Sequence, residues 1–342
     1  MKMIKNKTFS VSYFLGRAFF LGFGFSLLFK LLDKDAWIAS LLGVLLGSLF
    51  ICFFQKFKEN HALTNILQKS IFFLFNFFIF TQILFIFETF CSSFYLIKSP
   101  HIYILLPLIF IIYRITKNGF STITKVSDVL LPISLLLVLF ISLGLIKNMN
   151  FDYFLPVLTE DTFSILQGTI YFAIYSTAPF FLLWNEKTEK NLLKPYLLSS
   201  LTVFLAAIII TAVLGPNLTQ IYRYPEYMTL KKIKLFNFVE KVENIVSITW
   251  IFDLFITLAV SGNNMKELLP KKWKNFSFIG LLLLLFGISL YCGMHYKDEL
   301  WIYLYLPIIL GVFMLLLILV GFIRKKRNLN EQILFLFLDH LN

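Results

Sequence analysis

The residues with the clearest chemical potential lie where a long apolar run begins. In the stretch YRYPEYMTLKKIKLFNFVEKVENIVSITW, residues 222–250, charged side chains persist into the apolar part. Glu240, Lys241 and Glu243 form an acid–base–acid cluster there. Charged groups inside a membrane are costly and mark binding sites or internal ion pairs. For Lys241 and Glu243, a position among the lipid headgroups at the end of a helix is an equally good interpretation.

Polar residues recur along the same stretch at helical spacing. Asn237, Glu240, Asn244 and Ser247 follow one another at three- and four-residue intervals. Residues at this spacing share one face of a helix. A polar stripe of this kind is what a helix needs if it faces a water-filled cavity.

A further acidic residue, Glu88, lies inside the apolar run TQILFIFETFCSS. An intramembrane carboxylate either contacts a ligand or belongs to an internal ion pair. Lys241 and Arg223 are the candidate partners for such a pair, and both interpretations of Glu88 are open.

The composition determines which elements carry these residues. Apolar residues make up 58% of the 342, charged residues 15%, and the mean hydropathy is +0.80. A soluble domain of this length cannot bury so much apolar surface. The apolar runs are about 18 to 25 residues long, which is the length that crosses a bilayer as a helix. The sequence therefore predicts an all-α polytopic membrane protein, located in a cell membrane.

We predict ten transmembrane helices from these runs. They lie near residues 11–32, 36–54, 70–97, 101–116, 128–146, 163–184, 196–215, 236–259, 276–294 and 301–323.

The distribution of Lys and Arg predicts the orientation. With the N-terminus in the cytoplasm, the predicted inside segments hold 21 Lys and Arg residues, Arg17 among them, and the outside segments hold 9. Cytoplasmic loops carry an excess of these residues. Both termini are therefore expected in the cytoplasm, and this excess accounts for the net charge of +12 without a nucleic-acid partner.

Ten spans divide into two halves of five near residue 150. An odd number of spans per half inverts the second half, so we predict one repeat at 1–150, an inverted repeat at 151–323 and a cytoplasmic tail at 324–342. Such inverted repeats are typical of secondary transporters.

The first span of each half contains residues that interrupt helices. Gly22, Gly24 and Ser26 lie in the motif GFGFS of span 1. The motif YSTAPFF of span 6 holds Tyr175, Ser176, Thr177 and Pro179. Interrupted helices at matched positions of two inverted halves point to a binding site at mid-membrane. Close helix packing is the alternative explanation for the glycines.

Motifs for catalysis or metal binding are absent from the sequence. It has no phosphate-binding loop and no His-Glu-x-x-His motif, and its four histidines and three cysteines are scattered. We predict no enzyme activity, no cofactor and no metal site.

The stretch around residue 240 also resembles a known family. Its pattern is similar to a signature of the B subunits of spore germination receptors, and it is carried by Tyr224, Pro225, Lys232, Ile233, Phe238, Glu240, Lys241, Glu243 and Trp250. These germination permeases belong to the amino acid–polyamine–organocation superfamily, so the resemblance implies a LeuT-like fold with broken spans 1 and 6. Two features depart from the family: Lys241 replaces the usual arginine, and the tail carries the extra apolar run ILFLFLDHLN.

The resemblance implies a nutrient-sensing subunit in the spore inner membrane. Such a subunit binds an amino acid or similar small molecule and works with a partner membrane subunit and a lipoprotein. We place the ligand between spans 1, 3, 6 and 8. The candidate ligand-binding residues are Gly22, Gly24, Ser26, Glu88, Tyr175, Ser176 and Thr177. The candidate structural or coupling residues are Tyr224, Pro225, Glu240, Lys241, Glu243 and Asn244. An H⁺- or Na⁺-coupled amino-acid transporter is the alternative function.

Overall fold

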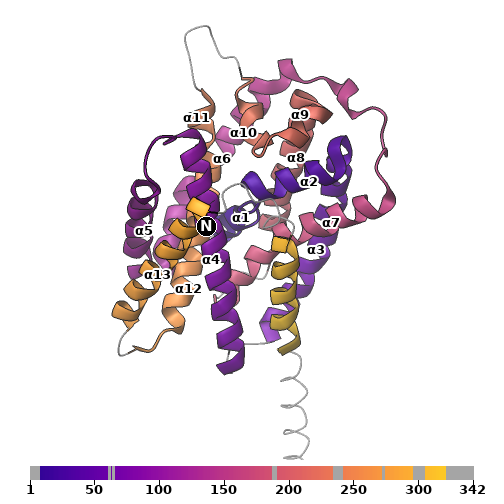
Figure 1. The fold of residues 1–342 in the computed structure, drawn as a ribbon. Helices are drawn as coiled ribbons and strands as arrows, with labels where there is room; N and C mark the ends of the chain where they lie inside the picture. The colour runs from indigo at the N-terminus through magenta and orange to yellow at the C-terminus, as the bar shows by residue number, and fades with distance from the viewer. Residues whose placement is uncertain are drawn as a thin grey trace, which may run out of the picture.

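A computed structural model describes residues 8–60, 63, 66–186, 191–233, 242–271, 274–295 and 305–320. Within these ranges the regular structure is entirely helical (Figure 1). The residues Asn237, Glu240 and Lys241 of the predicted polar cluster lie outside the described ranges.

Long helices make up most of the fold. They are α3 (Ala36–Asn60), α4 (Ile66–Phe94), α5 (His101–Lys117), α6 (Phe120–Leu145), α7 (Thr162–Thr177), α8 (Leu193–Leu214), α12 (Ile248–Leu268) and α13 (Lys274–His295). The shorter helices are α1 (Phe9–Leu15), α2 (Phe25–Leu32), α9 (Pro216–Ile221), α10 (Pro225–Leu230) and α11 (Val242–Val246), with a further apolar helix at Tyr305–Val320. Single turns of other helix types include η1 (Phe20–Gly24), η2 (Asp33–Asp35), η3 (Ile146–Asn148), η4 (Phe151–Phe154) and η5 (Ala178–Leu183).

The helices have the length and composition of membrane spans. Among the described residues, seven helical stretches are long and apolar enough to cross a bilayer. The first of these, Phe9–Lys58, contains two of the spans that the sequence predicts. The prediction of an all-α polytopic membrane protein is therefore confirmed, whereas the ten spans and the inverted repeat remain predictions.

The packing divides the long helices into two groups. In one group α3 packs against α7 and α8, and in the other α4 packs against α12 and α13, with α5 against the same two helices. The turn η1 contacts both α4 and α7, so it lies between the groups.

Helices α3 and α7 approach each other closely because glycines line their contact. A Cβ atom at Gly43 of α3 would lie 2.6 Å from the ring of Phe172 on α7. A Cβ atom at Gly168 of α7 would lie 3.3 Å from the Cβ atom of Ala39 on α3, and 2.3 Å from the side chain of Leu32 on α2. Small residues allow transmembrane helices to pack at short distance.

The eighth predicted span ends later in the sequence than we predicted. We predicted it at 236–259, and residues 236–241 lie outside the described ranges. Helix α12 extends from Ile248 to Leu268, which is nine residues beyond the predicted end. The polar residues Ser261 and Asn264 continue the helix because neighbouring elements supply hydrogen-bond partners. Ser261 Oγ donates to the carbonyl of Asn76 on α4 at 2.8 Å, and Asn264 Nδ2 donates to the carbonyl of Leu182 in η5 at 2.6 Å.

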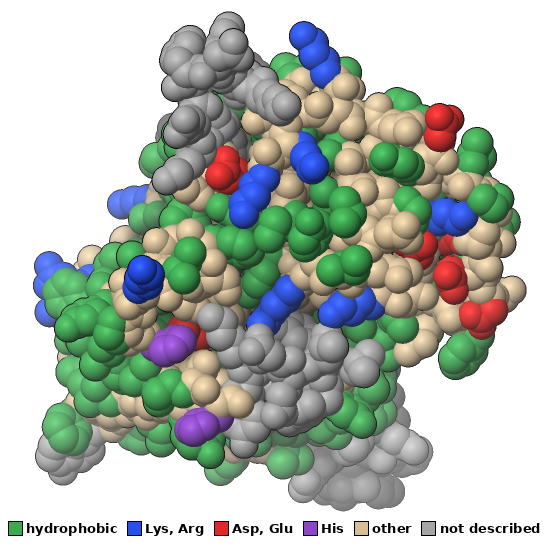
Figure 2. Space-filling view, turned by 45° about the horizontal axis from the view of Figure 1, so that its top comes forward, with side chains coloured by type: hydrophobic (Ala, Val, Ile, Leu, Met, Phe, Trp, Pro, Cys, Tyr) green, Lys and Arg blue, Asp and Glu red, His purple; other side chains and the backbone are tan. Residues whose placement is uncertain are grey.

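Charged and apolar side chains are separated over the surface. Figure 2 shows Lys, Arg, Asp and Glu side chains on the end of the molecule that carries α9 and α10, and mainly hydrophobic side chains on the flank at its lower left. Exposed leucine, isoleucine and phenylalanine residues are frequent on α5 and α6, such as Phe110, Leu136 and Leu139. This division fits a protein with a lipid-facing belt and a polar end.

Candidate functional site

The first span is interrupted in the middle of the protein. Helix α1 ends at Leu15, and after a turn the chain forms η1, in which Leu21 (ψ 116°) and Gly22 (φ 68°, ψ −21°) leave the helical conformation. A positive φ is readily adopted only by glycine. The helix resumes as α2 at Phe25. Gly22 therefore lies at a true break in the span.

The sixth predicted span changes its winding at the motif YSTAPFF. Helix α7 ends at Thr177, and residues Ala178–Leu183 continue as the 3₁₀ turn η5, with Pro179 in its first turn. Proline has no backbone N–H and cannot continue an α-helical hydrogen-bond ladder.

The space directly between the two interruptions is filled by aromatic rings. Tyr175 stacks on Phe19 with a centroid distance of 5.9 Å, and Phe20 lies against Phe172 at 4.8 Å. All four side chains are buried. The two interrupted spans therefore contact each other, but through packed rings.

The hydroxyl groups predicted to bind a ligand at span 6 are bonded within the protein. Ser176 Oγ donates to the carbonyl of Ala173 at 3.1 Å and lies 3.2 Å from the hydroxyl of Tyr196. Thr177 Oγ1 donates to the same carbonyl at 2.6 Å. Serine and threonine commonly bond the preceding turn of their own helix in this way.

The Tyr-Pro-Glu segment covers the break in the first span. A Cβ atom at Gly22 would lie 2.3 Å from the ring of Tyr224, so the ring rests directly on the glycine. The backbone N–H of Gly22 donates to Glu226 Oε1 at 2.7 Å. Pro225 begins α10 and places Glu226 in its first turn. A carboxylate from within the chain therefore already occupies the amide of Gly22, one of the predicted ligand-binding residues.

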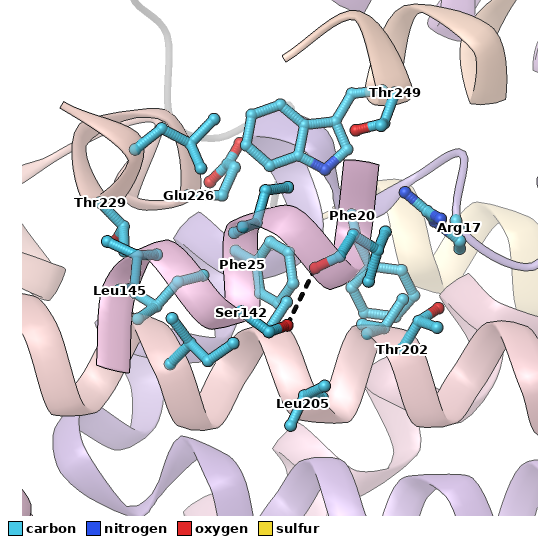
Figure 3. Close-up of a pocket in the computed structure, with 18 residues that line it drawn as sticks. Arg17, Phe20, Phe25, Ser142, Leu145, Thr202, Leu205, Glu226, Thr229 and Thr249 are labelled. Carbon is cyan, nitrogen blue, oxygen red and sulfur yellow. Dashed lines mark hydrogen bonds between the residues drawn. The ribbon is translucent and has the colours of Figure 1, made fainter. Parts of the chain in front are cut away.

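Glu226 also lines a cavity beside the break (Figure 3). The cavity is bounded by η1, α6, α8, α10 and the start of α12, and its walls are mainly aliphatic and aromatic. The polar side chains in its wall are Arg17, Ser142, Thr202, Glu226, Thr229 and Thr249. This cavity thus lies among spans 1, 5, 7 and 8. The wall does not include the predicted ligand residues Gly22, Gly24, Ser26, Glu88, Tyr175, Ser176 and Thr177.

Arg17 forms a buried ion pair. We counted it among the cytoplasmic charges, but its side chain is buried and its Nη2 lies 3.1 Å from Asp253 Oδ2 on α12. Arg17 Nη1 also donates to the hydroxyls of Tyr13 and, at 3.3 Å, Ser134. A buried charge is tolerated when it is paired and hydrogen-bonded. The cytoplasmic assignment of Arg17 was therefore wrong.

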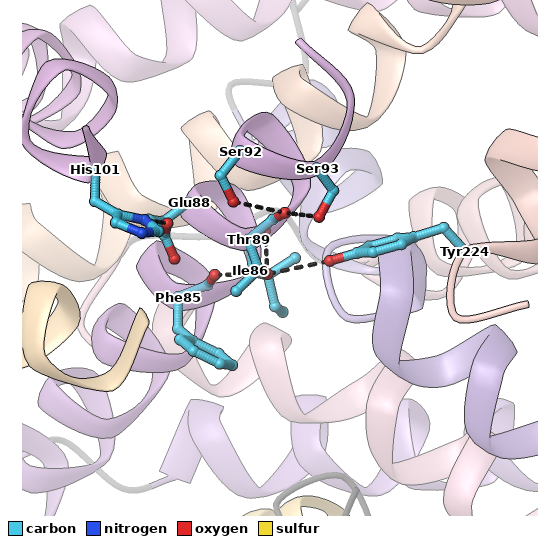
Figure 4. A network of polar contacts seen from close by, with 8 residues as sticks. All are labelled: Phe85, Ile86, Glu88, Thr89, Ser92, Ser93, His101 and Tyr224. Atoms are coloured by element: carbon cyan, nitrogen blue, oxygen red, sulfur yellow. Dashed lines mark hydrogen bonds and ion pairs between the residues drawn. The ribbon is translucent and has the colours of Figure 1, made fainter. Parts of the chain in front are cut away.

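Glu88 faces a different neighbour from the ones we considered (Figure 4). Its carboxylate pairs with the imidazole of His101 at the start of α5, and it lies against Gly293 of α13. The next residue, Thr89, accepts a hydrogen bond from the hydroxyl of Tyr224 at 3.1 Å. Glu88 of α4 thus contacts α5, and the adjacent Thr89 contacts Tyr224, the residue whose ring packs on Gly22.

The residues after the charged cluster join a set of tyrosines. Tyr227 donates its hydroxyl hydrogen to Asn244 Oδ1 at 2.7 Å. The hydroxyl of Tyr95 donates to the carbonyl of Asn244 at 2.8 Å and also contacts the hydroxyl of Ser247. Glu243 is half-buried at the start of α11. Asn244 and Ser247, the described part of the predicted stripe, therefore hold α11 against α4 and α10.

Comparison with known proteins identifies the family of this chain. Residues 10–300 match the family described as Spore germination protein. The chain belongs to this family. It is also similar to Spore germination protein XB of Bacillus anthracis, with 22% identity over 248 residues that cover 69% of this chain and 70% of that protein.

Membership of the spore germination family confirms the resemblance that the Tyr-Pro stretch indicated. Together with the apolar helices, it establishes a multi-pass, permease-like membrane protein, and the family is not a known enzyme family. The ligand-binding roles of individual residues stay predictions.

Sequence reasoning missed Glu226 and Asp253 as site residues of this spore germination protein. Proline followed by glutamate is a common helix start, because proline suits the first helical position and an acid the first turn. That signal predicts α10. It contains no sign that the carboxylate reaches Gly22, which is 204 residues away in the chain.

Proposed function

We propose that this chain is the ligand-sensing membrane subunit of a spore germination receptor, and that it binds an amino acid or similar small nutrient. The observation that carries the proposal is the break in the first span beside a cavity that Arg17 and Glu226 line. Interrupted helices and buried charges within a membrane protein are tolerated where they line a cavity or serve a ligand.

The cavity has the composition of a small-molecule site. Its walls are mainly apolar, and a few polar groups converge on it from separate elements. These elements include η1, which contacts both helix groups. A ligand that fits one arrangement of the groups better than another shifts the population toward that arrangement. In a receptor the change is passed to the partner membrane subunit and lipoprotein in the spore inner membrane.

Thermal-shift screening of the purified protein against individual amino acids tests this proposal. A ligand that binds only the folded state stabilises it by about 2.7 kcal/mol at a concentration 100-fold above its Kd. We expect one amino acid, or a small group of related ones, to raise the melting temperature. A melting temperature that no small nutrient changes would contradict the proposal.

A coupled transporter is the second candidate function, and one feature favours a proton as its coupling ion. Glu226 lies on α10, which in the sequence falls between the seventh and eighth predicted spans, and burial raises the pKa of Glu226 to about 8. A carboxyl group with a pKa near neutrality can take up and release a proton during a transport cycle. Uptake of radiolabelled amino acids into proteoliposomes, with and without a proton or sodium gradient, separates the two functions. Accumulation driven by either gradient would establish transport.

A further inference from the structure

We propose that Glu226 binds the ammonium group of the ligand, so that the cavity selects small aliphatic compounds that carry a primary amine. This inference rests on the proposed function, in which the cavity beside the break is the ligand site. It specifies the chemical class of the ligand and the residue that recognises it.

The two oxygens of Glu226 have different environments. Oε1 accepts the hydrogen bond from the amide of Gly22. Oε2 is buried and has no hydrogen-bond partner among the described residues, and the side chain borders the cavity. The whole residue is only 2% exposed. A buried acceptor without a donor is costly, and a ligand that supplies the donor removes that cost.

The charges around the cavity favour a cationic group at this position. The guanidinium of Arg17 is already compensated by Asp253. For Glu226, the described part of the chain offers no ion pair. Burial raises the pKa of Glu226 to about 8. A ligand ammonium would supply the missing donor and the opposite charge that favours the ionised carboxylate, and hydrogen bonds between ionised groups are stronger than neutral ones. A ligand carboxylate at the same position would oppose the ionisation of Glu226 and would meet a Gly22 amide that is already bonded.

The remaining walls indicate what the rest of the ligand is. The aliphatic residues in the wall include Ile141 and Leu145 of α6 and Val203, Ile209 and Ile210 of α8. An aliphatic side chain fits such a wall and a charged one does not. Figure 3 shows Arg17 on the side of the cavity away from Glu226, so the two charged side chains do not share one end of the cavity.

Matched probes separate the ammonium from the carboxylate. The first set is L-leucine, its amine-only analogue 3-methylbutylamine and its acid-only analogue 4-methylpentanoic acid. The second set is L-valine, 2-methylpropylamine and 3-methylbutanoic acid. Affinities are measured by titration calorimetry on purified wild-type protein and on Glu226→Gln. The glutamine keeps an oxygen for the Gly22 amide and replaces the second carboxylate oxygen by an NH₂ group, which is a donor. The hydrogen bond to Gly22 is therefore retained, whereas the acceptor for the ligand ammonium is lost.

Glu160→Gln is the matched control, because it makes the same chemical change outside the cavity wall. We expect the amine-bearing probes to bind the wild type and the control alike, and to bind Glu226→Gln roughly 10- to 100-fold more weakly, the range for a lost hydrogen bond to a charged group. The acid-only probes should bind the wild type at least about tenfold more weakly than the amines.

Two results would overturn the inference and leave the proposed function in place. One is equal affinity of the wild type and Glu226→Gln for whichever amino acid binds. The other is binding of the acid-only probes as tight as that of the amines. If no amino acid and no probe binds the wild type, the proposed function and the inference both fail.

Discussion

Gly22 determines the geometry of the break at the scale of a single residue. It adopts a φ of 68°, and the ring of Tyr224 occupies the position of a side chain. The sequence predicted an interruption here because two glycines follow each other closely in an apolar run. It did not predict that Tyr224 and Glu226 contact Gly22, because these two residues come from a segment that is distant in the chain and lies before a basic stretch.

Replacement of Gly22 by alanine should destabilise the protein and abolish its response to ligand. Alanine would have to adopt a positive φ, which is unfavourable for it, and its methyl group would collide with the ring of Tyr224. We therefore expect the free energy of unfolding to fall by roughly 1–3 kcal/mol. The measurement is the melting temperature of the purified variant in the same detergent as the wild type.

Gly280→Ala is the matched control, since a Cβ atom at this position of α13 has no neighbour within 4 Å. Alanine is the better helix former, so the control should be as stable as the wild type or slightly more stable. Equal melting temperatures for the Gly22 and Gly280 variants would show that the break is not constrained as described.

The stability of the protein should depend on pH through Glu226. Burial raises the pKa of Glu226 in the folded protein from 4.5 to about 8, and the hydrogen bonds from its own amide and from Gly22 oppose this only in part. The charged groups in and beside the same cavity are Arg17 and Asp253, which neutralise each other. A raised folded-state pKa means that the folded protein binds the proton more tightly. The contribution of Glu226 to the free energy of unfolding is therefore fully present below pH 4.5 and is lost as the pH rises through 8.

Unfolding of the wild type and of Glu226→Gln across this pH range measures the effect. Glutamine does not titrate, so the stability difference between the two proteins should change in favour of the variant as the pH rises. Parallel pH profiles would contradict the prediction.

At the scale of elements, the end of α12 shows what hydropathy does not report. We ended this span at residue 259, just before the polar run SGNN, residues 261–264. In the structure Asn264 Nδ2 donates to Asn76 Oδ1 at 2.9 Å, and both side chains are buried. A single sequence does not indicate that α4 carries the matching asparagine. Arg17 was misplaced for the same reason, since its partner Asp253 is on another element.

The asparagine pair should stabilise the contact between α4 and α12. Asn264→Ala leaves the Leu182 carbonyl and the Asn76 amide oxygen without this donor, and we expect a loss of roughly 0.5–2 kcal/mol, the range for hydrogen bonds between membrane helices. A double-mutant cycle with Asn76→Ala measures the coupling. Additive effects of the two substitutions would show that the pair contributes no interaction energy.

At the scale of the whole molecule, the apolar runs predicted most of the helices to within a few residues. Runs of spanning length are a strong signal because a bilayer tolerates little else. The location of the cavity was a weaker prediction: we expected spans 1, 3, 6 and 8, and the described cavity lies among spans 1, 5, 7 and 8. Packing between distant segments decides that location, and hydropathy contains no information about it.

The orientation in the membrane is a prediction that labelling can test. We expect residue 118, before α6, in the cytoplasm and residue 152, after α6, on the opposite side. Both Asn118 and Asp152 are exposed, so each can be replaced by cysteine in a variant that lacks Cys52, Cys91 and Cys292. A membrane-impermeant maleimide added to intact cells should label Asp152→Cys directly and Asn118→Cys only after permeabilisation. The reverse pattern would invert the topology.

The glycine-lined contact of α3 with α7 has a mechanical consequence. At Gly43 the ring of Phe172 fills the space of a side chain, and Gly168 lies close to Ala39, so sliding of either helix on the other would produce a steric clash. Closely packed helices such as α3 and α7 move together as a rigid body, and displacement is concentrated at the hinge between this group and the group of α4, α12 and α13. The η1 turn, which touches α7 on one side and α4 on the other, occupies the position of that hinge.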